Sequence, residues 1–279
     1  MKNWNARLKC IWANKGKRGF QRKMRLCLLP VMAGLALFYL LPFLKVILFS
    51  FRKGQFQKKF VGFANYAEVL GNPYFRLALK NTLLMIGICV PVFLLLSLLL
   101  TIFSVNTGKL GRYFRKLVFL PLFMPSVSIT AAFTLFLPDR GTPVPVYVMF
   151  LWKYLGMGIV ILTAAYLSVP YEIYEAAQMD GAGKMVTHLK ITLPLMKRAV
   201  QFVGVMGVVY CFRTFRESYL YYGQNYPPDY SYTLQYYMNN QFLKLNYQFM
   251  AAASVIIVLL IAVFVTVGSG VFHREEKHA

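Results

Sequence analysis

The sequence predicts an all-α integral membrane protein with six transmembrane helices, and three observations support that fold class. Hydrophobic residues make up 58% of the 279 residues and charged residues only 14%, whereas about a quarter of a typical soluble domain is charged. The mean hydropathy of +0.52 requires that apolar surface be covered by something other than water. Six apolar segments are each close to the roughly 20 residues that span a bilayer. Backbone groups in hydrocarbon must hydrogen-bond internally, so we expect these segments to be helices.

The six segments form a single transmembrane domain, which we expect to cover residues 1–279. The first segment is too long for the apolar region of a signal peptide and no A-x-A cleavage site follows it, so it should be an uncleaved helix. The expected spans cover about residues 26–50, 81–105, 117–137, 146–169, 199–222 and 249–272.

The charge distribution also indicates a membrane protein. Lys and Arg outnumber Asp and Glu by 31 to 9, and nine of the basic residues lie within residues 1–25, before the first acid, Glu68. Loops on the side of the N-terminus carry 19 Lys and Arg, and loops on the other side carry 8. This excess predicts that both termini face the cytoplasm. Nucleic acid is not an expected partner, because the sequence lacks both zinc-ligand spacing and a basic-aromatic pattern.

Motifs for catalysis or cofactor binding are missing from the sequence. The cysteines, Cys10, Cys27, Cys89 and Cys211, form no CxxC pair, so no metal or redox site is expected. The chain has no phosphate-binding GxxxxGK[ST] and no HExxH. We therefore expect no enzyme and no bound cofactor. A secondary carrier or a channel remains an alternative, although carriers usually place acids or His in several spans, and Glu217 is the lone acid expected within one.

The segment 172–196, between the fourth and fifth spans, has the pattern of two short helices around a turn. Glu172 and Glu175 suit the start of a helix, where acids oppose the helix dipole. Asp180-Gly181 is a turn signal, and Pro194 closes the segment. A structured helix-turn-helix of this kind between two spans requires a surface to dock against.

Three parts of this segment resemble the EAA loop of permease subunits of bacterial ABC importers: Glu175-Ala176-Ala177, Asp180-Gly181-Ala182 and Ile191-Thr192-Leu193-Pro194. Other segments resemble carbohydrate permeases of the MalF-like type. They are Val61–Tyr66, Ala78–Leu83, Phe114-Arg115 with Phe119–Pro121, and Trp152-Lys153 with Gly156.

The resemblance implies the type I ABC importer permease fold in a bacterial cell membrane. It also implies four partner subunits: a second permease, two ATPases that hold ATP and magnesium, and an extracytoplasmic substrate-binding protein. The cargo would be a sugar or oligosaccharide. The residues expected to couple the permease to the ATPases are Glu175, Ala176, Ala177, Asp180, Gly181, Ala182, His188 and Pro194.

Two features depart from the pattern of this family. The segment Pro138–Pro145, between the third and fourth spans, is shorter than the corresponding loop of the family. His188 occupies a position where the family often has Phe.

Charged residues within the spans are candidates for a substrate pathway. Arg213 and Glu217 are four residues apart, which places them on one helix face and predicts an ion pair. Arg213 is 14 residues beyond Ala199 and Lys153 is 17 residues before Pro170, so they lie about 21 Å and about 26 Å from the cytoplasmic boundary. One interpretation is a polar lining at the external gate or cavity. The other is a structural ion pair, with Lys153 reaching toward the surface.

Sugars bind through aromatic stacking and hydrogen bonds to their hydroxyls. Trp152, Tyr154, Tyr210 and Thr214 offer such groups at similar depth, although interfacial anchoring is an alternative for the first two. Alignment to maltose-type permeases brings six residues onto sugar-site positions, and several are not of the polar type found there. These are Phe150, Tyr154, Met157, Tyr210, Cys211 and Thr214.

The last external loop is rich in tyrosine. Two interpretations fit: a docking surface for the binding protein, or anchoring at the membrane interface. The residues are Tyr219, Tyr221, Tyr222, Tyr226, Tyr230, Tyr232, Tyr236 and Tyr237.

Overall fold

The computed structural model describes residues 28–54, 59–138, 140–223 and 225–275. The expected basic N-terminal segment 1–25 lies outside the described residues. Within them the chain is helical, and its only β pairing is an isolated bridge between Arg52 and Phe60. The helices are η1 Ala36–Leu40, α2 Leu41–Ser50, α3 Ala64–Gly71, α4 Pro73–Asn106, α5 Gly108–Phe119, η2 Leu120–Phe123, α6 Ser126–Phe136, α7 Val144–Leu167, α8 Tyr171–Met179, α9 Lys184–Thr187, η3 His188–Thr192, α10 Leu193–Leu195, α11 Lys197–Arg213, α12 Phe215–Tyr222, η4 Asp229–Ser231, α13 Leu234–Leu243 and α14 Tyr247–Glu275.

Four described helices are long and apolar enough to cross a membrane: Leu28–Ser50, Pro73–Asn106, Val144–Leu167 and Tyr247–Thr266. Two bent pairs bring the number to as many as six, Gly108–Phe123 with Ser126–Phe136 and Lys184–Leu195 with Lys197–Tyr222. This agrees with the predicted all-α membrane fold.

The third expected span, residues 117–137, is divided by a sharp bend next to Pro125. The chain bends by 105° between Phe123 and Ser126. Met124 there is extended, with φ −69° and ψ 138°, because the ring of the following Pro125 disfavours the helical conformation at the residue before it. The apolar run is therefore divided between α5 with η2 and the separately directed α6.

The second span also differs from expectation, since α4 begins at Pro73 rather than near residue 81. Asn72 caps this helix: its side chain accepts hydrogen bonds from the backbone N–H of Tyr74 at 2.9 Å and of Phe75 at 3.4 Å. A side-chain cap with proline at the first helical position is a strong start signal.

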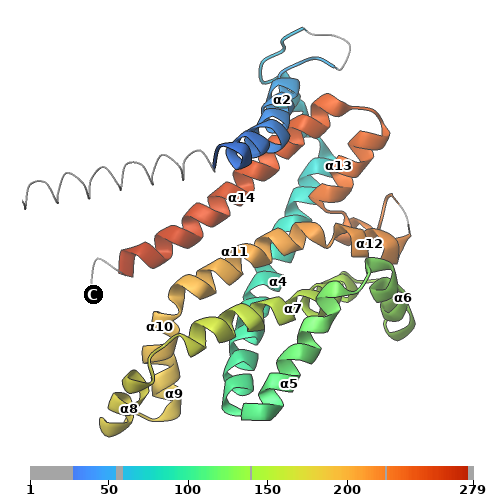
Figure 1. The fold of residues 1–279 in the computed structure, drawn as a ribbon. Coiled ribbons are helices and arrows are strands. Elements are labelled where there is room, and N and C mark those ends of the chain that lie inside the picture. Colours follow the sequence, from blue (N-terminus) through green and yellow to red (C-terminus); the bar gives the residue numbers. More distant parts are fainter. Residues whose placement is uncertain (1–27, 55–58, 139, 224, 276–279) are drawn as a thin grey trace, which may run out of the picture.

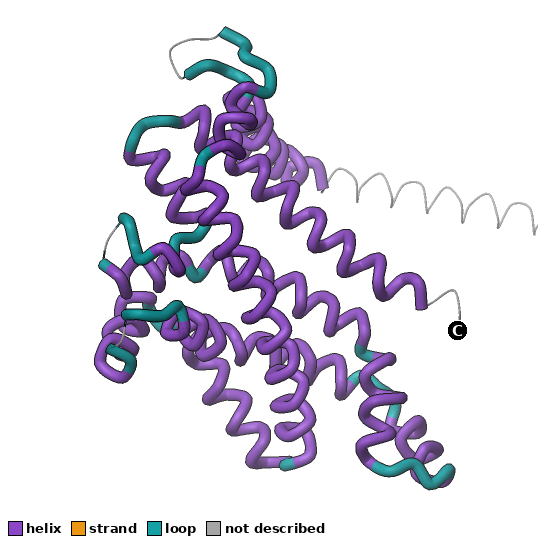
Figure 2. The backbone as a smooth tube through the Cα atoms, turned by 180° about the vertical axis from the view of Figure 1, so that it is seen from behind, coloured by secondary structure: helices purple, strands orange, loops and turns teal. Residues whose placement is uncertain are grey.

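Helix α4 lies at the centre of the bundle and packs against α7, α11, α5 and α13, while α2 lies along α14 (Figures 1 and 2). Small residues allow the closest crossings. A Cβ atom at Gly156 on α7 would lie 2.2 Å from the carbonyl oxygen of Val118, and one at Gly158 would lie 2.4 Å from Oγ of Ser97. The buried ring of Phe93 lies beside Gly158.

Much of the outer surface is apolar. In the first span, the most apolar window has no buried residue, and Phe38 and Tyr39 are each 73% exposed. Exposed apolar surface on this scale is costly in water, so it must contact lipid or another protein.

The eight tyrosines between residues 219 and 237 lie together at one side of the bundle, and we call them the tyrosine cap. Five of the eight are buried, so those five are available neither as a docking surface nor as interfacial anchors. Their hydroxyls are used internally: Ser231 donates to Tyr222 at 2.7 Å, and Asn240 donates to Tyr232 at 3.0 Å. The five are Tyr221, Tyr222, Tyr232, Tyr236 and Tyr237.

Candidate functional site

The segment 172–196 forms a helical hairpin that projects from the end of the molecule opposite the α2–α3 connection (Figure 1). Helix α8 ends in a Schellman motif. The N–H of Ala182 donates to the carbonyl of Ala177 at 2.9 Å, and the N–H of Gly181 donates to that of Gln178 at 3.0 Å. This motif requires a left-handed residue, and Gly181 supplies it with φ +76°. The predicted turn at Asp180-Gly181 is therefore confirmed.

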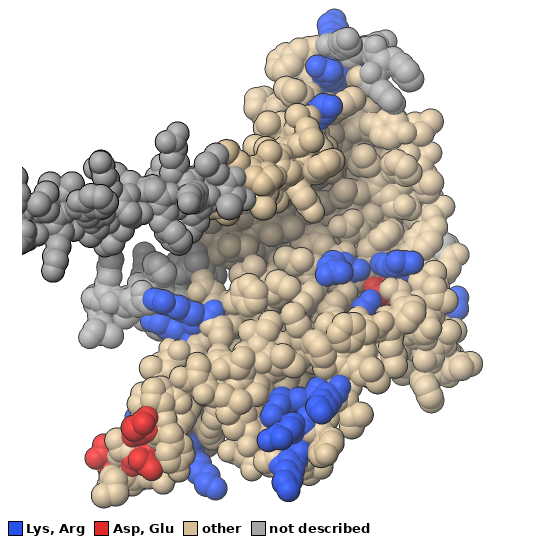
Figure 3. Space-filling view, viewed as in Figure 1, with Lys and Arg blue, Asp and Glu red and all other residues tan. Residues whose placement is uncertain are grey.

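The tip of this hairpin exposes both apolar and acidic side chains. Met179 and Met185 are 88% and 74% exposed. Glu172, Glu175 and Asp180 are exposed as well, and Figure 3 shows acidic atoms gathered over α8. Large exposed apolar groups with a polar rim are typical of a surface that docks another protein.

The eight residues expected to couple to the ATPases do not share one environment. Ala177, on the inner side of α8, is buried, whereas Ala182 and His188 are half-buried. The exposed members are Glu175, Ala176, Asp180, Gly181 and Pro194.

His188 faces a hollow beneath the hairpin. Its ring centre lies 6.1 Å from that of Tyr166, and with Tyr174 and Lys184 it lines a cavity of about 430 Å³. Burial lowers the pKa of His188, and the nearby Lys184 ammonium lowers it further. The buried Nδ1 atom has no hydrogen-bond partner among the described residues.

A second group of charges lies where α6, α7 and α12 meet. We call Ser126, Lys153, Arg213, Arg216 and Glu217 the polar cluster. Glu217 is 1% exposed, and its Oε1 atom accepts hydrogen bonds from Oγ of Ser126 at 2.6 Å and from Nζ of Lys153. Lys153 also lies over the ring of Tyr154, 5.5 Å from its centre.

The predicted pair between Arg213 and Glu217 is wrong. Helix α11 ends at Arg213 and α12 begins at Phe215, and Glu217 pairs with Lys153 instead. Arg213 and Arg216 are exposed. Lys153 does not extend to the surface, because its side chain is only 13% exposed and turns inward to the carboxylate.

The aromatic candidates pack on one another. Tyr154 and Tyr210 are stacked with ring centres 4.2 Å apart and planes 7° apart, and Phe150 lies against Tyr154. All three are buried, so their faces are not presented to a cavity in this structure. Trp152 is 39% exposed and meets Phe133 edge-on, and Met157 is half-buried.

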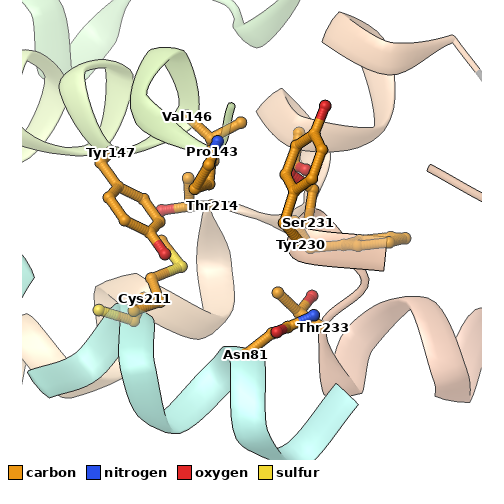
Figure 4. A pocket seen from close by; sticks show the side chains of 12 residues that line it. Asn81, Pro143, Val146, Tyr147, Cys211, Thr214, Tyr230, Ser231 and Thr233 are labelled. Carbon is orange, nitrogen blue, oxygen red and sulfur yellow. The ribbon is translucent and has the colours of Figure 1, made fainter. Parts of the chain in front are cut away.

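Cys211 and Thr214 line a narrow hollow between α4, α7 and the segment around η4, and Figure 4 shows Tyr147, Tyr230 and Asn81 around the same space. Its volume is about 20 Å³. A hollow of this size has room for about one water molecule, so it is too small for a sugar ring in this conformation.

Residues that join α4 to the tyrosine cap were not identified from the sequence. The Asn81 side chain donates to the carbonyl oxygens of Asp229 and, at 2.9 Å, of Tyr232. Oγ1 of Thr82 accepts a hydrogen bond from the N–H of Leu234 at 3.0 Å. The only signal for this role was the pair of polar residues where the long apolar run of α4 begins.

Comparison with known proteins identifies the family. A family model described as "Binding-protein-dependent transport system inner membrane component" matches residues 61–275. The arabinooligosaccharides transport system permease protein AraP of Bacillus subtilis (strain 168) is 29% identical over 268 residues, which is 85% of this chain and 84% of that protein. The lactose transport system permease protein LacF of Rhizobium radiobacter is 26% identical over 265 residues, 84% of this chain and 88% of that protein.

The fold has a counterpart among solved structures. A chain in the crystal structure of a bacterial ABC transporter involved in the import of alginate superposes with a TM-score of 0.75 at 20% identity, covering 95% of this chain and 98% of that chain. This likeness supports the importer permease fold, and the family model matches most of the sequence. The chain therefore belongs to the family of inner membrane components of binding-protein-dependent transport systems.

Proposed function

We propose that this chain is one of two permease subunits of an ABC importer that carries a sugar or oligosaccharide. Members of its family are transport subunits rather than enzymes. Relatives named for arabinooligosaccharides and lactose support the class of cargo. The observation that carries the proposal is the projecting hairpin 172–196, which presents an exposed apolar and acidic tip on a Schellman-capped helix.

In this proposal the hairpin is the EAA loop and docks into a cleft of a cytoplasmic ATPase subunit. Met179 and Met185 would be buried in that cleft. The carboxylates of Glu172 and Glu175 would face basic groups of the ATPase, because no ion pair occupies them among the described residues. The capped turn makes the hairpin a stiff lever, as required for a contact that transmits motion between two states.

The topology follows from this docking. The hairpin and both termini are cytoplasmic, and the tyrosine cap faces outward, where an extracytoplasmic binding protein delivers the cargo. A second permease covers part of the exposed apolar surface. ATP and magnesium are held by the two ATPases, and this chain binds neither.

Copurification tests the proposal. A tag on this chain should isolate a second permease and an ATPase dimer from membranes, and the single chain should hydrolyse no ATP. Reversing two charges at the tip, with Glu172→Lys and Glu175→Lys, should release the ATPases while the second permease remains bound. Substituting the exposed Lys109 of α5 by Gln is the matched control. ATPases that stay bound to the double variant would contradict the docking.

Topology is tested separately by cysteine labelling. In a variant without the four native cysteines, a cysteine at Lys184 should be protected from an impermeant reagent in intact cells and should react in opened membranes. Labelling of that position from outside intact cells would contradict the assignment.

A further inference from the structure

The polar cluster has an unbalanced charge. Glu217 is committed to Lys153 and Ser126, so it does not neutralise Arg213 or Arg216. The other acids of the described chain lie outside the long spans or at their ends. They are Glu68, Glu172, Glu175, Asp180, Asp229 and Glu275. Three cations and one carboxylate therefore leave two positive charges at this place.

The two guanidinium groups are neighbours on an exposed face. Thr214, between α11 and α12, keeps near-helical angles, with φ −69° and ψ −6°. Residues three apart therefore lie side by side. Figure 3 shows basic atoms around a single acidic group over the α11–α12 junction, beside a hollow in the surface.

The position of Arg213 along α11 places this face within the expected membrane span. Arg213 is 16 residues beyond Lys197, where α11 begins, which corresponds to about 24 Å along a helix axis. With Lys197 at the cytoplasmic boundary, as in the proposed topology, Arg213 lies in the outer third of a core about 30 Å thick. A charged side chain at membrane depth almost always faces a water-filled path or another protein.

Guanidinium groups select a particular ligand chemistry. Arg holds carboxylates and phosphates with paired hydrogen bonds, which combine charge with geometric fit. The other carboxylate oxygen of the buried Glu217, Oε2, has no partner among the described residues. That atom is itself buried, so the accessible groups of the cluster are the two guanidinium groups. A ligand that bears an oxyanion would satisfy both.

We propose that the cargo is a sugar bearing an oxyanion, either a carboxylate or a phosphate, and that Arg213 and Arg216 receive that group as the cargo passes. This inference rests on the proposed sugar importer and specifies its substrate class. The Lys153–Glu217 pair holds α7 and α12 together beside the two arginines and keeps the acid from competing with the cargo for them.

The test uses the complete transporter, purified through a tag on this chain and reconstituted with its binding protein. Cargo-stimulated ATP hydrolysis is measured with matched pairs of sugars. The pairs are oligogalacturonates with their methyl esters, and sugar phosphates with the free sugars. The wild type should respond to the charged member of a pair and not to the neutral one, and the responding pair distinguishes carboxylate from phosphate.

Three variants test whether the two arginines are responsible for the response to the charged sugar. Substituting both arginines by Gln should lower the response to the charged sugar by roughly tenfold, as expected when a charge-assisted hydrogen bond is lost. Substituting both by Lys should retain much of the response. Lys80→Gln removes another exposed positive charge, from α4, and should leave the response unchanged.

Several outcomes would overturn the inference. If neutral sugars stimulate hydrolysis and the Gln variant matches the wild type, the charge assignment fails while the sugar importer stands. If no sugar stimulates hydrolysis, the proposed function fails as well. If the Gln variant loses the second permease and the Lys variant retains it, the arginines pair with an acid of that subunit. If the effect appears only in liposomes with anionic lipid, they bind headgroups instead.

Discussion

Lys153 on α7 and Glu217 on α12 form a buried ion pair between residues 64 positions apart in the chain. Ser126 at the start of α6 donates to the same carboxylate oxygen. A single carboxylate therefore joins three helices, one of which follows the sharp bend at Pro125.

Breaking this pair from one side should destabilise the protein. Glu217→Gln leaves the Lys153 ammonium without a counter-charge, and the loss of one member of a buried pair costs about 3–5 kcal/mol. We expect a lower unfolding temperature in detergent and less protein in the membrane.

Removing both charges should be milder, because no buried charge is then left alone. The double variant with Lys153→Met and Glu217→Gln should recover much of the stability, since Gln still accepts from Ser126. Arg213→Gln is the exposed control and should unfold like the wild type. A double variant as unstable as Glu217→Gln alone would contradict the pairing.

Gly181→Val should uncouple ATP hydrolysis from cargo without lowering membrane abundance. A Cβ atom added at this position would meet no atom within 4 Å, so the penalty is purely conformational. A side chain in the left-handed region costs about 1–2 kcal/mol, and relief requires the Schellman turn to change shape. The measurement is cargo-stimulated ATP hydrolysis by the assembled complex.

Gly183 provides the control for this prediction, because its φ of −66° is accessible to any residue. Gly183→Ala should preserve cargo-stimulated ATP hydrolysis. Gly181→Asn should lower it less than Gly181→Val does, since Asn tolerates the left-handed conformation. Normal coupling in Gly181→Val would show that the turn need not keep its shape.

Gly156→Ala should destabilise the crossing of α5 and α7. The added Cβ would meet the backbone of Val118 at 2.2 Å, and overpacking of this kind costs about 1–3 kcal/mol. The matched control is Gly87→Ala on α4, where no atom lies within 4 Å of the new carbon. Thermal unfolding should separate the two variants, and equal unfolding temperatures would contradict the close crossing.

His188 should make the hairpin less stable in mild acid. Its pKa in the folded protein is lowered by burial and by Lys184, so the unfolded chain binds the proton more readily. The free energy of unfolding of the hairpin is therefore highest above the ordinary histidine pKa of about 6.5. It decreases as the pH falls below that value, because the unfolded chain takes up the proton first.

His188→Phe should remove this part of the pH dependence, because the aromatic contact with Tyr166 is kept and the titrating group is gone. Hydrogen exchange of the 172–196 segment between pH 8 and 5.5 measures the effect. An unchanged pH profile in the Phe variant would show that another group is responsible.

The fold was largely predictable because hydropathy is a local signal and lipid imposes helices on long apolar runs. The Gly181 turn was predictable for a similar reason, since the Asp-Gly pair and the motif it closes lie within one segment. The break at Pro125 is of the kind expected where proline interrupts a helix, but its angle of 105° was not predictable, because hydropathy carries no information on direction.

The polar cluster depended on packing between distant helices. Four-residue spacing suggested Arg213 as the partner of Glu217, but α7 presents Lys153 to the buried side of α12, and Arg213 is exposed whereas Glu217 is buried. The tyrosines were misjudged for the same reason. Their composition suggested a surface, whereas contacts with α4 and with the segment before α7 help to bury five of them.

In the proposed transport cycle, ATP hydrolysis drives sugar through this chain by way of the 172–196 hairpin. The most direct measurement is sugar uptake into proteoliposomes that contain the transporter purified through this chain, with ATP inside and loaded binding protein outside. We predict uptake that requires ATP and is abolished by Glu172→Lys with Glu175→Lys. Uptake that proceeds without ATP, driven by an ion gradient and unaffected by the double variant, would contradict the account.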